Sequence, residues 1–395
     1  MTSVLMYSHD TVGLGHARRN RALAFALAQG LPELTGTPVG GLLVAGNPYA
    51  ASDPLPAGWD WFILPGMTHA GRGHVPRHLD ASAGAVSQFR SLSIRAAAST
   101  LQPDLFIVDR HPWGISHELE GTLRQLHANG CAIVLGLREV IDQPEQAAAE
   151  WERLGNPERL GAVFDDVWLY GDPAVHDART TGELPAVLAN MAHATGYLSR
   201  GRPRDVGTPA EHRPYVLTLM GGGSDGYALA RIAAAVRVPA GFDHILITGP
   251  QMPDPEVEDL ERRAGAGPAA PRIRRSAPNI PALIGDASAV VSMCGYNTAT
   301  EILASTTPAL IVPRSTRRTE QLLRAEALER ADAVDLVRLE NLDATMLERW
   351  IASAVTRRVR RDHIDLDGLH SVPALAASLL RQKKTHMKGE LASVT

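Results

Sequence analysis

The chain contains one succession of elements twice: a short apolar strand, a turn with glycines, and a helix. In the first half, a strand predicted at residues 3–7 is followed by a loop that ends in Gly13-Leu14-Gly15-His16, and then by a helix. In the second half, a strand predicted at residues 215–220 leads directly into the glycine-rich residues 221–226 and a second helix. Strand, glycine turn and helix open a Rossmann-like unit with a parallel sheet. Because 395 residues exceed what one core usually serves, we predict two such domains.

Neither glycine turn is a standard nucleotide motif. In a dinucleotide fingerprint, Gly13 and Gly15 would be followed by a third glycine, but Arg18 stands there. Residues 221–226 are not followed by the Lys-Ser/Thr pair of a Walker loop. Glycines together with Ser224 can nevertheless surround a diphosphate with backbone N–H groups.

A third strand-to-helix turn lies near Gly295. Residues 289–292 are apolar and β-branched, which predicts a buried parallel strand, and residues 298–304 are predicted to be helical. Gly295 lets the backbone approach a ligand without a Cβ, and a helix that begins there attracts phosphate with its free N–H groups. Glu301 follows in the first turns of this helix, where it could accept two hydrogen bonds from a ribose diol. On this stretch alone, an ordinary strand-to-helix turn is the alternative.

The composition excludes several classes of partner. A formal net charge of −4 provides no electrostatic basis for binding nucleic acid or an anionic membrane. No run approaches the ~18 apolar residues of a membrane span. The chain begins with a strand and shows no signal peptide, and its two cysteines lack the spacing of metal ligands. We therefore expect a cytoplasmic protein with reduced thiols.

Ionisable residues follow two predicted strands of the first half. Asp109 and His111 come directly after one apolar strand, and Arg138 and Glu139 follow the next. Because parallel strands present their carboxyl ends at one edge of the sheet, where ligands bind, these four are candidate site residues. Ion pairing among them with a purely structural role is the alternative.

The sequence leaves the role of two further charged stretches open. Residues 65–80 form a predicted long loop with His74 and other histidines, for which acceptor contact ranks above metal binding and a plain surface loop above both. Arg18, Arg19 and Arg21 occupy the first turns of the first helix, where positive charge opposes the helix dipole. An acidic neighbour or a bound anion would resolve that conflict, and a solvated arginine face is the alternative.

Together these residues resemble the GT-B glycosyltransferases, most closely the MurG-like members of glycosyltransferase family 28. The resemblance covers nearly the whole chain and is strongest over residues 220–325. It implies an α/β fold in which two Rossmann-like domains with parallel sheets face each other across a cleft. It also implies that the N-terminal domain binds an acceptor and the C-terminal domain binds a nucleotide-sugar.

The family's motifs imply a role for individual residues at the donor. They comprise a first-domain loop residue, a diphosphate loop, a segment that reads the base, a second phosphate-facing turn with a ribose-binding carboxylate, and a polar pair that holds the sugar. In that order they are Gly15; Gly222, Gly223, Ser224 and Asp225; Ala277 and Pro278; Gly295, Tyr296, Asn297, Thr298 and Glu301; and Glu320 and Gln321. Asp225 and Glu320 stand where the family has glutamine, which would suit a different sugar, such as an amino or deoxy sugar.

The implied chemistry is group transfer with inversion at the anomeric carbon. A base removes the proton of the acceptor hydroxyl while the nucleoside diphosphate departs. His16 matches the family's loop histidine and is the first candidate for this base, and Asp109 or Glu139 could serve instead. Helix N-termini and backbone N–H groups would stabilise the leaving diphosphate, so we expect neither a metal nor another cofactor.

The predicted organisation follows the same family pattern. Residues 1–198 would bind the acceptor, residues 212–365 would bind the donor, a helix at 366–382 would pack back on the first domain, and 383–395 would be a flexible tail. We expect a UDP-sugar as donor, a small-molecule, glycan or lipid-linked acceptor, and a monomer or homodimer. A nucleotide-sugar epimerase and a catalytically idle partner of another transferase are the alternatives. The acceptor would be contacted by His74, His111 and Arg138.

Overall fold

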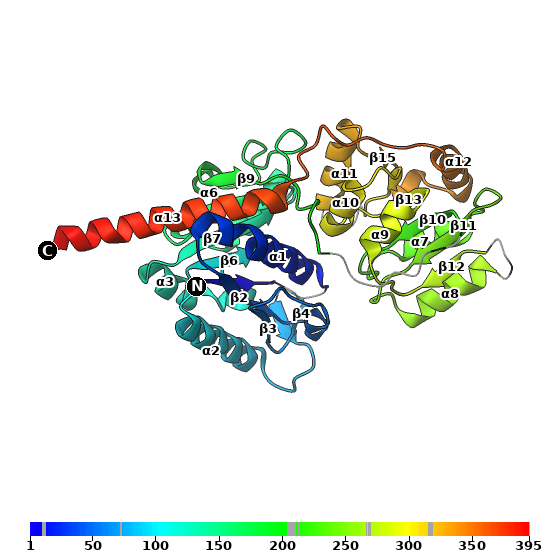
Figure 1. The fold of residues 1–395 in the computed structure, drawn as a ribbon. Helices are drawn as coiled ribbons and strands as arrows, with labels where there is room; N and C mark the ends of the chain where they lie inside the picture. The colour runs from blue at the N-terminus through cyan, green and yellow to red at the C-terminus, as the bar shows by residue number, and fades with distance from the viewer. Residues whose placement is uncertain are drawn as a thin grey trace. The chain divides into compact units, whose positions relative to one another are not determined.

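The computed structural model describes residues 1–9, 13–71, 73–203, 211, 213–265, 267, 270–314 and 319–394, with side chains described up to residue 385. The chain divides into two compact units (Figure 1). Unit 1 comprises Met1–Pro173, Asp177–Pro203 and Asp367–Thr395, and unit 2 comprises Ala174–His176 and Arg204–Leu366. Most of the segment between the predicted domains, including residue 212 at the predicted boundary, lies outside the described residues.

Unit 1 is built on a seven-stranded parallel sheet with the strand order β3-β2-β1-β6-β7-β8-β9. Its central strands are buried along their length, as the apolar sequences of a sheet covered on both faces require. The order turns back at β1, because β2 and β6 flank it, so ligands are expected at the carboxyl ends of β1 and β6. The strands are β1 (Thr2–Tyr7), β2 (Val39–Ala45), β3 (Trp59–Ile63), β6 (Leu105–Asp109), β7 (Ala132–Arg138), β8 (Asp166–Tyr170) and β9 (Ala192–Ala194).

The helices of unit 1 connect these strands, and the last of them comes from the far end of the chain. In sequence order they are α1 (Gly15–Thr35), α2 (Ala83–Leu101), α3 (Glu120–Ala128), α4 (Pro144–Arg153), α5 (Glu158–Gly161), α6 (Ala186–Asn190) and α13 (Gly368–Val394), with short 3-10 turns η1 (Pro48–Ser52) and η2 (Ile115–His117). Helix α13 packs on α1. The two helices lie close together at Gly30 of α1, where an added Cβ would be only 2.8 Å from Cγ of Pro373 in α13.

The segment 383–395, expected to be a flexible tail, is instead helical as far as Val394. Its polar composition suggested fraying, but most of its residues are good helix formers that extend the preceding helix. The Nζ atom of Lys383 also pairs with Oδ1 of Asp165 at 2.6 Å, which holds this part of α13 against unit 1.

The long loop expected at residues 65–80 is also different in the structure. It contains a hairpin of β4 (Met67–Ala70) and β5 (Gly73–Pro76), in which His69 pairs with His74. Glycine, histidine and alanine have low strand propensity, so the pattern did not reveal the two short strands. His74 therefore lies on a paired strand and not in an open loop.

Unit 2 contains a six-stranded parallel sheet with the order β12-β11-β10-β13-β14-β15. Its turning point lies between β10 and β13. The strands are β10 (Tyr215–Leu219), β11 (Asp243–Ile247), β12 (Arg272–Arg274), β13 (Ala289–Ser292), β14 (Ala309–Ile311) and β15 (Asp335–Leu336). The helices are α7 (Tyr227–Ala234), α8 (Asp254–Ala264), α9 (Ile280–Asp286), α10 (Tyr296–Leu303), α11 (Glu320–Arg330) and α12 (Ala344–Ala354), with a 3-10 turn η3 (Leu339–Asn341).

Each sheet has its own apolar core, formed around the central strands of unit 1 and of unit 2. Two parallel sheets with helices between their strands confirm the predicted α/β class. In the described part of the chain, no helix combines the length and the apolar character needed to cross a membrane.

Candidate active site

The predicted base lies at the turning point of the sheet in unit 1. Helix α1 begins at Gly15, two residues earlier than the sequence indicated, so His16 lies in its first turn. Asp109 is the last residue of β6, which pairs directly with β1. The Nδ1 atom of His16 is 3.0 Å from Oδ2 of Asp109. Two residues that the sequence predicted separately are therefore in direct contact.

Arg19 completes this group from the next turn of α1. Its Nη2 atom donates to both carboxylate oxygens of Asp109 at 2.7 Å, and both side chains are buried. The conflict between an arginine and the helix dipole is thus resolved here by an acidic neighbour. Arg21 is also buried and donates to the carbonyl of Pro54 at 2.8 Å. A solvated arginine face is therefore wrong for these two residues.

The protonation states of His16 and Asp109 follow from their surroundings. Burial raises the pKa of the Asp109 carboxyl, but Arg19 and His16 outweigh burial and lower this pKa to about 2. Burial lowers the pKa of His16, although Asp109 opposes that effect. At neutral pH, Asp109 is therefore an anion and His16 is neutral and able to accept a proton. Both carboxylate oxygens of Asp109 are already bonded to Arg19, and one of them also to His16, so His16 is better placed to take the proton.

The other predicted residues of unit 1 lie around this pair. Arg138, the last residue of β7, is near enough to His16 to lower its pKa. Glu139 is buried and packs against Gly171, where an added Cβ would lie 2.3 Å from Cβ of Glu139. His16 retains 22% of its side-chain surface exposed to solvent, so it is better placed than Glu139 to meet an acceptor.

His9, which the sequence analysis missed, connects these groups. It follows β1, and its ring centroid lies 3.7 Å from that of His111. The ring centroids of His16 and His74 lie 6.1 Å and 6.0 Å away from it. The criterion that selected Asp109, an ionisable residue just beyond the carboxyl end of a buried strand, would have selected His9 as well.

In unit 2, the predicted diphosphate loop follows β10. Gly221 has φ +60, and an added Cβ there would meet no atom within 4 Å. An added Cβ at Gly223 (φ +94) would instead lie 2.4 Å from the carbonyl oxygen of Thr248. The carbonyl of Gly222 accepts a hydrogen bond from the backbone of Gln251 at 2.9 Å. Gly223 is thus required by packing against the loop after β11, and Gly221 leaves backbone open to a ligand.

The second phosphate-facing turn lies next to this loop, because β13 pairs with β10. Gly295 precedes α10, and an added Cβ there would meet no atom within 4 Å. Asn297 and Thr298 are half-buried in the first turn of α10, whereas Tyr296 and Glu301 are buried. The open backbone at Gly295 and the start of an eight-residue helix provide the geometry expected for an anion site.

Arg314, to which the sequence analysis gave no role, connects three predicted donor residues. Its guanidinium pairs with Oδ2 of Asp225 at 2.6 Å and lies 3.7 Å from Oε1 of Glu320. Its backbone N–H donates to the side chain of Gln321 at 3.3 Å. Asp225 follows β10 and Arg314 follows β14, so this group joins the ends of the two strands that flank β13.

Arg324 stabilises the turn that precedes α10. It is fully buried in α11, donates to the carbonyl of Cys294 at 3.0 Å, and lies over the ring of Tyr296. Ala277 and Pro278, predicted to read the base, follow β12, which is two strands away from β10. They therefore follow the edge strand of this sheet, and β11 separates that strand from β10.

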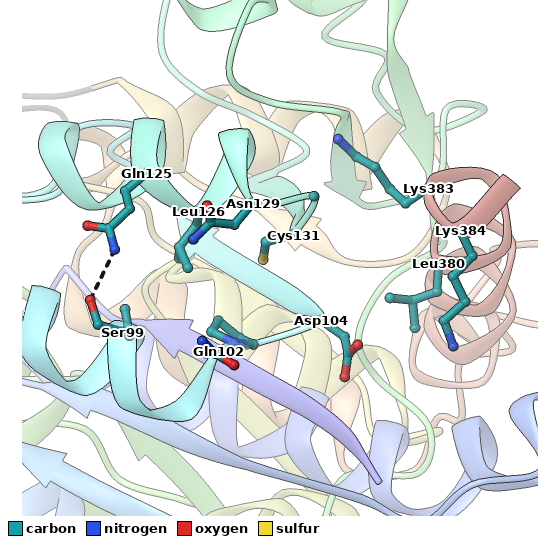
Figure 2. A pocket seen from close by; sticks show the side chains of 13 residues that line it. Ser99, Gln102, Asp104, Gln125, Leu126, Asn129, Cys131, Leu380, Lys383 and Lys384 are labelled. Atoms are coloured by element: carbon teal, nitrogen blue, oxygen red, sulfur yellow. Dashed lines mark hydrogen bonds between the residues drawn. The ribbon is translucent and has the colours of Figure 1, made fainter. Parts of the chain in front are cut away.

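A cavity of 640 Å³ in unit 1 lies away from these residues (Figure 2). It is bordered by Asp104 and Cys131, which precede β6 and β7, and by Lys383 and Lys384 of α13. It is thus at the amino edge of the sheet, opposite to His16 and Asp109. Within the described residues, no three His, Cys, Asp or Glu side chains are arranged to hold a metal ion.

Comparison with known proteins identifies the second unit. Residues 228–362 match the family described as the glycosyltransferase family 28 C-terminal domain. The chain is a glycosyltransferase. This match confirms the predicted enzyme class and the resemblance to family 28. No curated protein matches the sequence of the chain.

Several solved structures share the fold of the whole chain. VinC in complex with DTDP is 17% identical, with 100% of this chain and 99% of that chain covered and a TM-score of 0.57. MurG of Acinetobacter baumannii is 14% identical, with 98% and 100% covered and a TM-score of 0.51. MnaA of S. aureus in complex with UDP is 11% identical, with 99% and 97% covered and a TM-score of 0.57. These similarities confirm the predicted GT-B fold class of this glycosyltransferase.

Proposed function

We propose that this glycosyltransferase moves a sugar from a nucleoside diphosphate sugar to an acceptor hydroxyl, with inversion and without a metal. The contact between His16 and Asp109 carries this proposal, since it joins a neutral imidazole to a carboxylate that remains ionised. Unit 1 would supply the base and bind the acceptor, and unit 2 would bind the donor.

The tautomer of His16 follows from the charge of its partner. An ionised carboxylate only accepts hydrogen bonds, so Nδ1 of His16 must carry a proton to make a favourable contact with Asp109. The Nη2 atom of Arg19 lies 3.1 Å from the same nitrogen, but its hydrogen bonds are directed to Asp109. This arrangement leaves Nε2 of His16 unprotonated and available to accept a proton.

The proposed reaction is a single displacement. The acceptor hydroxyl transfers its proton to Nε2 of His16 as its oxygen forms a bond to the anomeric carbon. The bond between that carbon and the diphosphate oxygen breaks, and the nucleoside diphosphate leaves with the electron pair. Asp109 stabilises the imidazolium that forms, while Arg19 keeps Asp109 ionised throughout.

The donor site is proposed at the ends of β10 and β13. The open backbone at Gly221 and Gly295 and the N-terminus of α10 would hold the diphosphate, and Glu301 would accept hydrogen bonds from the ribose. The complexes of VinC with DTDP and of MnaA with UDP support a pyrimidine nucleoside diphosphate, and we propose UDP as the first to test. Positive potential from these backbone groups is the reason that no metal is proposed.

We also propose a cytoplasmic location. Cys131 and Cys294 are both buried free thiols, a usage typical of reducing compartments.

The function is tested by incubating the protein with a panel of UDP- and dTDP-sugars and a panel of hydroxylated acceptors, with product analysis by mass spectrometry and NMR. Transfer to an acceptor with inverted anomeric configuration is the expected result, and His16→Ala should abolish most of it. Conversion of the sugar without an acceptor would instead support an epimerase. Binding of no nucleotide-sugar, measured by thermal shift, would support a catalytically idle partner.

A further inference from the structure

His9 lies at the centre of a group of imidazole rings beside the proposed base. Its ring is tilted by 40° against that of His111 at 3.7 Å, and the rings of His16 and His74 meet it edge-on. The ring of His74 also lies 4.6 Å from that of His69. One histidine thus contacts the base and two residues that the sequence predicted to bind the acceptor.

A nitrogen of His9 is left without a partner. Nδ1 of His9 is buried and has no hydrogen bond in the described part of the molecule, and only 7% of the residue is exposed. Nε2 of His74 is likewise buried without a hydrogen-bond partner among the described residues. Buried polar atoms in folded proteins are nearly always hydrogen-bonded, so an unpaired nitrogen next to a reaction site points to a ligand that pairs with it.

The charges around His9 indicate which ligands suit it. Burial lowers the pKa of His9 well below its usual value, and the nearby His16 and His74 lower it further, so the ring is neutral. Arg110, which also faces His9, is paired with Glu150 at 2.9 Å. Asp109 is likewise paired with Arg19, at 2.7 Å. A neutral imidazole can both donate and accept hydrogen bonds, as a hydroxyl can.

We propose that His9 positions the acceptor by hydrogen bonding through Nδ1 to a second hydroxyl adjacent to the one that His16 deprotonates, so that the enzyme selects acceptors with neighbouring hydroxyl groups. The inference rests on the proposed function of His16. The 6.1 Å between the two ring centroids allows neighbouring hydroxyls to reach both rings at hydrogen-bond distances of about 2.8 Å.

The test compares a vicinal diol with its single-hydroxyl analogue, using catechol and phenol as acceptors with the best donor of the panel. The parent should show a kcat/KM for catechol that exceeds that for phenol by about 10–100-fold. His9→Phe retains a planar ring but no nitrogen, and the ratio should fall towards one. His9→Asn places an amide near the position of Nδ1 and should restore most of the preference. His370→Phe, at an exposed position of α13, should keep the parental ratio.

The outcomes separate this inference from the proposed function. A parent that transfers sugar to neither acceptor, nor to any other in the panel, contradicts the proposed function. A parent that transfers sugar without preferring catechol overturns the role of His9 alone. Equal preference in the parent and in His9→Phe, with both proteins folded by thermal melting, overturns it as well. An effect of His9→Phe that His9→Asn does not rescue assigns His9 to packing and also contradicts the inference.

Discussion

Nδ1 of His16 and Oδ2 of Asp109 lie 3.0 Å apart, with Arg19 bonded to the same carboxylate. A base, the group that orients it and the charge that keeps this group ionised thus come from only two elements, α1 and β6. The two elements are adjacent because β1, which leads into α1, pairs with β6.

Removing His16 should separate catalysis from binding. We expect His16→Ala to lower kcat by ~10²–10⁴ while donor affinity stays nearly unchanged, because the imidazole acts only as the proton is transferred. The measurements are steady-state kinetics and calorimetric titration with UDP. A parental kcat in this variant would exclude His16 as the base, and weaker UDP binding would indicate a phosphate contact instead.

Asp109→Asn should change the pH profile as well as the rate. Asp109 raises the pKa of His16 by stabilising the imidazolium, so its neutralisation lowers that pKa further. Because neutral His16 is the active form, the acidic limb of kcat/KM should move to lower pH, and the plateau should fall because the imidazolium loses its partner. An acidic limb that moves to higher pH would contradict the assignment.

Glu301→Ala should weaken donor binding by ~2–3 kcal/mol, since two ribose hydroxyls would lose a charged acceptor. Calorimetry with UDP measures the change. Glu329→Ala, at an exposed position of α11, is the matched control and should bind UDP like the parent. If Glu301→Ala binds UDP as tightly as the parent and melts at the same temperature, the ribose must lie elsewhere.

Turnover should survive chelation. Backbone N–H groups and helix ends would supply the positive potential that a metal provides in other transferases. Initial rates with EDTA should equal those with added Mg²⁺ or Mn²⁺. A complete loss with EDTA that either ion restores would refute metal independence.

Arg324→Ala should lower the free energy of unfolding by about 2–4 kcal/mol, because it leaves a buried cavity and an unpaired carbonyl at Cys294. Urea denaturation measures the loss. Arg330→Ala, at the exposed end of the same helix, should cost much less. Equal losses in the two variants would show that Arg324 does not support the turn before α10.

His244 should make stability depend on pH. Burial lowers the pKa of His244 from 6.5 to about 4. Above pH 6.5 both states are neutral, and between pH 6.5 and 4 only the unfolded chain binds the proton, so stability falls as pH falls. The full contribution is about 3 kcal/mol. His244→Leu should reduce the slope of unfolding free energy against pH in this window, whereas the exposed His370→Leu should not.

Much of this fold could be predicted because buried parallel strands have continuous apolar sequences, as at residues 105–109 and 289–292. The hairpin at 67–76 could not, because its residues have low strand propensity and its pairing depends on tertiary context. The position of Asp109 and His111 just after an apolar strand made them site candidates, but the sequence could not predict their contacts. The contact between His16 of α1 and Asp109 of β6 depends on the order of the strands in the sheet. Gly223 resembled a ligand-facing glycine, yet its role is set by Thr248, which is distant in sequence.

The packing of α13 on α1 at Gly30 and Pro373 has a consequence for synthesis of the chain. Helix α1 leaves the ribosome more than 300 residues before α13. At 5–20 residues per second, its apolar face waits on the order of tens of seconds for its partner. All of unit 2 is translated in that interval. We therefore expect unit 2 to be native before unit 1, and chaperones that shield apolar helices to bind the nascent first unit.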